Sequence, residues 1–94
     1  MRQQFLIHQA DDMVGVAVQD LAPGPGVTGR FQTSGEELQV EVLDPVPLGH
    51  KVALRDIPEG ELVIEYGIAI GLATSDIRTG QHVHVHNVKG RRWA

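Results

Sequence analysis

The chain has 94 residues, which is enough for one compact core and too few for two. Its formal charge is −4 and its acidic and basic residues are interspersed, which argues against a nucleic-acid-binding surface. It contains no cysteine, which excludes disulfides, a thiolate nucleophile and any thiolate-bound metal centre built by this chain alone.

The N-terminal part predicts short strands separated by turns. Residues 1–10 lack the long apolar segment of a signal peptide, and no later stretch could span a bilayer, so a cytoplasmic protein without membrane partners is expected. The apolar runs 5–8 and 13–18 are joined by two aspartates and predict a β-hairpin. Residues 22–26 alternate proline with glycine and are expected to form a solvent-facing loop.

The rest of the chain continues this pattern of strands. Residues 38–43 alternate apolar and polar side chains, which predicts a half-buried strand that ends at the prolines of residues 44–49. Further strands are predicted at 51–54, 62–66, 67–73 and in the histidine segment that follows. A helical turn is expected at 72–77, and no internal repeat is evident. Short strands spaced in this way favour a small all-β barrel or sandwich.

Near the C-terminus, three of the five histidines occupy alternate positions, His82, His84 and His86, with valines between them. In an extended strand the three imidazoles share one face and the valines share the other, buried face. Neighbouring imidazoles on such a face are about 6.5 to 7 Å apart, so two can bind one ion and the third is left for substrate or support. Metal ligation by these histidines, with proton transfer by His84, is therefore preferred to a solvated polar face. Asn87 is expected to bind substrate or to orient a histidine, or else to end the strand.

A second group of candidates follows Gly49 at the start of a predicted strand. His50 is a candidate general acid or base, and Lys51 is a candidate anchor for a substrate anion. The alternatives are that His50 only begins the strand and that Lys51 is solvated. Arg91 is expected to bind anionic substrate, and the tail that includes it could also dock on a partner or be frayed.

Three segments carry a family resemblance: PLGHKVALRDIPEGELVIEYG (residues 47–67), IAIGLATSDIRTGQHVHVHN (residues 68–87) and KGRRW (residues 89–93). Together they resemble the SAF-type small domain or subunit of the altronate/galactarate dehydratase family. The resemblance implies one SAF-type β-clip domain over residues 1–94, with a flexible C-terminal tail from about residue 89. The free-standing length, the third histidine and the basic tail are most similar to the sulfolactate-cleaving members.

The resemblance also implies a reaction and a partner. The chain is expected to be the small subunit of a lyase whose large catalytic subunit provides most of the machinery. The implied reaction is β-elimination from a small anionic 2-hydroxy acid, assisted by a divalent metal, Fe²⁺, shared between the subunits. (2R)-3-Sulfolactate, giving pyruvate and bisulfite, is the expected substrate, and dehydration of altronate or galactarate is the alternative. A non-catalytic assembly module and a stand-alone metal-binding protein are the competing interpretations.

Overall fold

The computed structural model of the chain describes residues 3–90. Within this range all regular structure is β, which confirms the predicted fold class, and no helix is present that could cross a membrane. The strands are β1 (Phe5–Ile7), β2 (Val14–Ala17), β3 (Gly24–Phe31), β4 (Glu37–Val42), β5 (Lys51–Ala53), β6 (Leu62–Glu65), β7 (Ile68–Ala73), β8 (His82–Val83) and β9 (Val88–Lys89).

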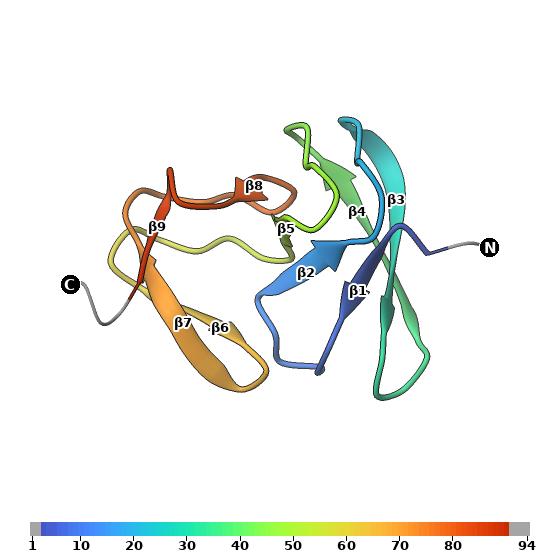
Figure 1. Cartoon of the computed structure of the whole chain (residues 1–94), viewed down its shortest axis with the longest axis horizontal. Coiled ribbons are helices and arrows are strands. Elements are labelled where there is room, and N and C mark those ends of the chain that lie inside the picture. Colours follow the sequence, from blue (N-terminus) through green and yellow to red (C-terminus); the bar gives the residue numbers. More distant parts are fainter. Residues whose placement is uncertain (1–2, 91–94) are drawn as a thin grey trace.

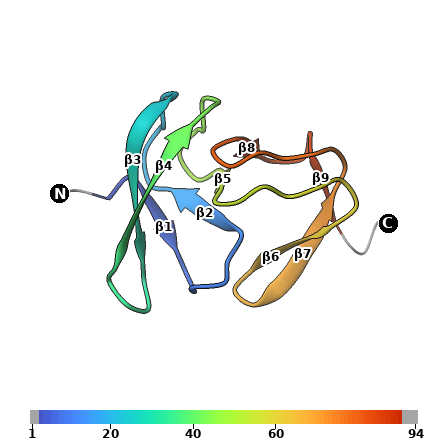
Figure 2. The ribbon, with the colours of Figure 1, turned by 180° about the vertical axis from the view of Figure 1, so that it is seen from behind.

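The strands form two sheets (Figure 1). The larger has the order β4-β3-β1-β2-β5-β8, and the smaller has the order β6-β7-β9. Strands β1 and β2 form the predicted antiparallel hairpin, whereas β1 and β3 pair in parallel. Seen from behind, β3 and β4 lie at one end of the molecule and β7 and β9 at the other, with β5 and β8 between them (Figure 2). This topology brings the histidine segment beside β5.

Two apolar clusters hold the sheets together. The first lies within the larger sheet and is built around Phe5 and Ile7 with valines of β3, β4 and β5. The second joins the sheets, because it contains Val14 and Ala53 from the larger sheet and Val63 from the smaller. Aliphatic side chains supply nearly all of this buried surface, as the low aromatic content requires. The strands that carry the candidate site are therefore fixed to one another by a shared core.

A short turn motif recurs and pairs with itself, although no repeat was expected from the sequence. Residues 56–60 (DIPEG) and 76–80 (DIRTG) meet where Ile57 and Ile77 exchange backbone hydrogen bonds of 2.7 and 2.8 Å. Each turn's aspartate accepts a backbone N–H from the other turn, Asp56 from Thr79 at 2.8 Å and Asp76 from Glu59 at 2.9 Å. Leu21 and Val46 pair in the same way in the turns 20–24 and 44–49. Four such similar turns thus lie in two pairs.

Two further expectations, for residues 72–77 and 22–26, differ from the structure at these turns. The helical turn at 72–77 is absent, because Ile77 is committed to its bridge with Ile57 and Ala73 belongs to β7. The loop at 22–26 is only partly a loop, since β3 already begins at Gly24. A register shift between Gly24 and Val27 accommodates the proline between them, which has no N–H to donate.

The predicted C-terminal tail overlaps the last strand. Lys89, where the tail was expected to begin, lies in β9 and pairs with Leu72 of β7. Arg91, like the rest of the basic segment after residue 90, lies outside the described residues. Its expected contact with an anionic substrate stays a prediction.

Candidate functional site

The alternation of residues predicts one extended strand for the histidine segment. The structure shows a short strand and a turn in its place. Strand β8 contains only His82 and Val83, and the chain then turns through residues 84–87 before β9. The backbone N–H groups of Asn87 and Val88 both donate to the carbonyl of His84, at 3.1 and 3.0 Å. Val83 is buried as expected, but Val85 is 80% exposed. The three imidazoles therefore do not share one flat face.

Asn87 closes this turn. Its side-chain oxygen accepts a hydrogen bond from the backbone N–H of His84 at 3.0 Å, and its amide nitrogen donates to the carbonyl of His82 at 2.8 Å. The residue is buried, and both ends of its amide are used inside the turn. These contacts agree with the alternative in which Asn87 orients histidines, since it holds the backbone of two of them, and its expected contact with substrate stays a prediction.

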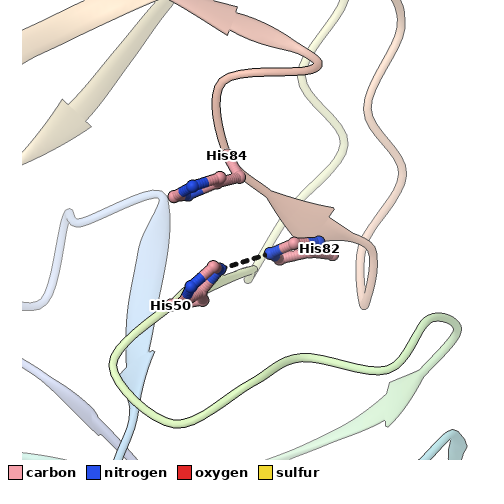
Figure 3. A group of neighbouring side chains, drawn as sticks. All are labelled: His50, His82 and His84. Atoms are coloured by element: carbon pink, nitrogen blue, oxygen red, sulfur yellow. Dashed lines mark hydrogen bonds between the residues drawn. The ribbon is translucent and has the colours of Figure 1, made fainter.

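His50 supplies the third imidazole of the site, from a segment 32 residues before His82. It directly precedes β5, and the pairing of β5 with β8 sets Val52 opposite His82. Nδ1 of His50 is 2.9 Å from Nε2 of His82, and its ring stacks on that of His84 with the centroids 4.2 Å apart (Figure 3). The candidate ligand atoms of His50, His82 and His84 all lie within 4.8 Å of one another. We call these three residues the histidine cluster.

His86, which belonged to the expected ligand set of His82, His84 and His86, is outside the cluster. Its ring centroid is 5.1 Å from that of His82, but its nitrogens do not join the group that could meet one ion. The physical reason is the turn at 84–87, which breaks the strand alternation before His86. Sequence reasoning identified His50 as a candidate acid or base but missed it as a ligand, because only sheet pairing brings it to His82.

The surroundings of His82 and His84 favour the neutral form of these two imidazoles. Burial is the main cause that lowers the pKa of His82, and His86, His50 and His84 lower it further, with Asp44 acting in the opposite direction. Desolvation against its neighbours also lowers the pKa of His84, followed by the charges of His50, His86 and Lys51. Neutral imidazole is the form that binds metal ions, so the lowered pKa of His82 and of His84 favours ligation by these two residues.

A buried carboxylate that sequence reasoning missed lies beside Lys51. Glu65 is 8% exposed, and its two oxygens lie 3.9 Å from Nζ of Lys51 and 3.6 Å from Nε2 of His8. Its position in an apolar strand run concealed it, although it occupies the core-facing register of β6. The half-buried Lys51 is thereby kept on the side of the molecule that carries His84.

Lys51 and His84 share an open concavity of about 310 Å³. Its lining consists of Lys51, Ile70, Val83, His84, Val85, Val88 and Gly90. One cationic side chain and one imidazole thus border a mainly apolar hollow. Of the three cluster residues, His84 is exposed and borders this concavity, whereas His50 and His82 are half-buried.

The geometry of the cluster suits a divalent ion. With metal–nitrogen bonds of about 2.1 Å, two ligating nitrogens are about 3.4 Å apart at a tetrahedral angle and about 3.0 Å apart at an octahedral angle. The 2.9 Å between His50 Nδ1 and His82 Nε2 is close to the octahedral separation. With no ion between them, one of these two nitrogens must donate its proton to the other, which is the alternative use of the same geometry.

Comparison with known proteins places this chain in a family. Residues 3–91 match the altronate/galactarate dehydratase SAF domain. The chain belongs to this family. Over 94 residues it is 48% identical to the (2R)-sulfolactate sulfo-lyase subunit alpha of Chromohalobacter salexigens, covering 99% of this chain and all of that relative. It is 44% identical over 86 residues to an altronate dehydratase of Escherichia coli, covering 92% of this chain but 16% of the relative. An altronate dehydratase of Bacillus subtilis is 37% identical over 89 residues, with the same 16% coverage.

The family membership confirms the predicted resemblance. As an SAF domain, the fold occurs both as a free-standing chain in the sulfo-lyase relative and as a small part of the two dehydratases. In the dehydratases it is covalently joined to a much longer chain.

Proposed function

We propose that this chain is the small subunit of a heteromeric lyase that catalyses metal-assisted β-elimination from a 2-hydroxy acid. Its proposed substrate is (2R)-3-sulfolactate, which would yield pyruvate and bisulfite. The similarity over the full length of a sulfolactate sulfo-lyase subunit alpha supports this substrate. The coverage of only 16% of the altronate dehydratases supports a role beside a larger catalytic chain.

The observation that carries the proposal is the histidine cluster on an open surface. His50, His82 and His84 would hold a divalent metal ion, with Fe²⁺ the expected one, and the large subunit would supply the remaining ligands. Such an ion would polarise the substrate carboxylate as a Lewis acid and so stabilise the charge that develops when the α-proton leaves. His84 is exposed and borders the open concavity, where a second chain could reach the ion.

The reaction balances without an external oxidant or reductant. A base removes the proton from C2, those electrons form the C2–C3 double bond, and the C3–S bond breaks so that its electron pair leaves with sulfite. The resulting enol becomes pyruvate. A ring nitrogen that ligates an ion cannot also take up a proton, so we assign His50 and His84 to ligation. The base then belongs to the large subunit.

Lys51 would bind one of the two anionic groups of the substrate. It lines the concavity beside His84, and Glu65 at 3.9 Å restrains its ammonium group from behind. An ammonium at this position would attract a carboxylate or sulfonate toward the cluster. Since the pair is partly exposed, we expect the ion pair to orient Lys51 more than it stabilises the fold.

A sugar-acid dehydratase is the second candidate. It is favoured by the 44% identity to an altronate dehydratase, since the same cluster could serve elimination of hydroxide in place of sulfite. The competing interpretations without catalysis are a binding or assembly module and a stand-alone metal-binding protein.

An assay of the reconstituted complex separates these possibilities. The chain would be co-expressed with its large subunit, and sulfite release from (2R)-3-sulfolactate would be compared with keto-acid formation from altronate and galactarate. His50→Ala and His84→Ala should each lower kcat at least about a hundredfold and reduce bound iron, because each removes a ligand. His86→Ala is the matched control, because His86 belongs to the same turn but lies outside the cluster. This variant should keep most of its kcat and most of its bound iron.

The outcomes are distinct. Full activity of His84→Ala would refute the assignment of the cluster. Loss of activity in His86→Ala but not in His50→Ala would restore the alternating row as the ligand set. A stable complex that is inactive on all three substrates would favour an assembly module.

A further inference from the structure

The most exposed large apolar side chains of the described residues are those of Val85 and Ile68, at 80% and 63%. A register shift at Ile70 interrupts the pairing of β6 with β7, so that Leu62 pairs with Leu72 but Glu65 pairs with Ile68. Ile68 therefore lies on the face of the hairpin that carries Glu65, and Leu62 lies on the other face. Ile70, at the register shift, is 37% exposed and lines the same concavity as Val85. We call Ile68, Ile70 and Val85 the β6–β7 apolar face.

This face is continuous with the candidate site. Ile70 and Val85 line the same concavity as Lys51 and His84. A body that closes over the histidine cluster from this side must therefore contact the apolar face as well. A small anionic substrate cannot cover it, because aliphatic side chains offer no partner for charged groups. Contiguous exposed apolar surface beside a polar site is typical of a protein interface.

We propose that the β6–β7 apolar face docks the large catalytic subunit and so seals the histidine cluster from water. This inference rests on the proposed function. The large subunit is preferred to a second copy of this chain because the concavity joins the face to His84, where the large subunit would supply the remaining ligands of the ion. The altronate dehydratases support the same occupant, since in them the matching region makes up 16% of a longer chain.

The position of the face in the fold agrees with this occupant. β6 and β7 lie at the end of the molecule opposite β3 and β4, and β9 runs beside β7 (Figure 1). A partner seated on β6 and β7 would leave β3 and β4 of the larger sheet free. It would meet the cluster at the turn 84–87, where His84 and Val85 are adjacent in sequence.

Two substitutions on the face and one control test the proposal. Ile68→Glu and Ile70→Glu would place a carboxylate in the interface, and each should raise the Kd for the purified large subunit on the order of a hundredfold. Val18→Glu is the control, because Val18 is an aliphatic residue of similar exposure to Ile70, 41% against 37%, outside the apolar face. Association is measured without substrate by isothermal titration calorimetry. Circular dichroism and metal binding of each isolated variant establish that fold and cluster are intact.

The results separate this inference from the proposed function. Wild-type association of both face variants would overturn it, as would equal weakening by Val18→Glu. A dimer of the isolated chain that Ile68→Glu dissociates would assign the face to a second copy and overturn it too. A wild-type complex that forms through this face but shows no lyase activity would support the docking surface while refuting the proposed reaction.

Discussion

Gly80 offers the sharpest test of how the paired turns support the site. Gly60 and Gly80 occupy equivalent places in the two turns and have nearly the same left-handed backbone, with φ of 88° and 90°. Their surroundings differ. A Cβ on Gly60 would meet nothing within 4 Å, whereas a Cβ on Gly80 would overlap the carbonyl oxygen of Glu41. Gly60→Ala therefore isolates the backbone cost, and Gly80→Ala adds the steric cost.

The magnitudes follow from these surroundings. An L-residue in the left-handed region costs about 1–2 kcal/mol, which is the loss expected for Gly60→Ala. In Gly80→Ala the end of β4 must also move, which adds about 1–3 kcal/mol for overpacking. The hydrogen bond from Leu43 N–H to the Gly80 carbonyl, 2.8 Å long, would be lost with it, for about 1 kcal/mol more. We expect a loss of about 3–6 kcal/mol in Gly80→Ala, a large part of the stability of a small domain.

Urea denaturation followed by circular dichroism measures both variants. Gly80 lies two residues before β8, which carries His82. Gly80→Ala should therefore also weaken metal binding by the histidine cluster, while Gly60→Ala should not. Equal losses of unfolding free energy in the two variants would refute the reasoning, because the close approach of Glu41 would then carry no cost.

Two further predictions concern the hydrogen bonds of the turns. Asn87→Ala should lower the unfolding free energy by about 2 kcal/mol and weaken metal binding, because the His84 N–H and the His82 carbonyl lose their partner. Asn87→Asp keeps the acceptor, so its stability should fall between those of wild type and Asn87→Ala. An Asp variant no more stable than the Ala variant would contradict this reasoning. Asp56 accepts hydrogen bonds from the backbone and hydroxyl of Thr79, which hold the pKa of its carboxyl below its ordinary value of 3.8. The stability that these hydrogen bonds give is present above pH 3.8 and is lost as the pH falls through the lowered pKa of Asp56. Asp56→Asn should therefore lose less unfolding free energy than wild type between about pH 6 and about pH 3. Equal acid sensitivity in urea denaturation would exclude that role.

Local pattern was sufficient for most strands of the fold. The alternation in residues 38–43 became β4, and the apolar runs at 5–8 and 13–18 became the hairpin β1–β2, because burial of one face depends on nearest neighbours along the chain. Local pattern failed where a long-range contact decided the outcome. Ile77 was expected in a helical turn, but its partner Ile57 lies 20 residues away and fixes it in a bridge.

The repeated turns were hidden for a related reason. The residues that the turns share, an aspartate, an aliphatic side chain and a glycine, are ordinary turn chemistry when seen singly. Only their pairing in space, Ile57 with Ile77 and Leu21 with Val46, shows that the same unit is used in each pair.

For the candidate site too, the sequence determines one part and the long-range contacts determine another. The sequence by itself determined the available chemistry, since the absence of cysteine excludes thiolate ligands, the histidines supply imidazole ligands and Lys51 supplies a cationic anchor. The tertiary structure decided which residues act together. The pairing of β5 with β8 brings His50 to His82, and the turn closed by Asn87 removes His86 from the cluster. Spacing along a strand fixes the direction of a side chain only while the strand continues, whereas a ligand set depends on distances that sheet pairing and turns create.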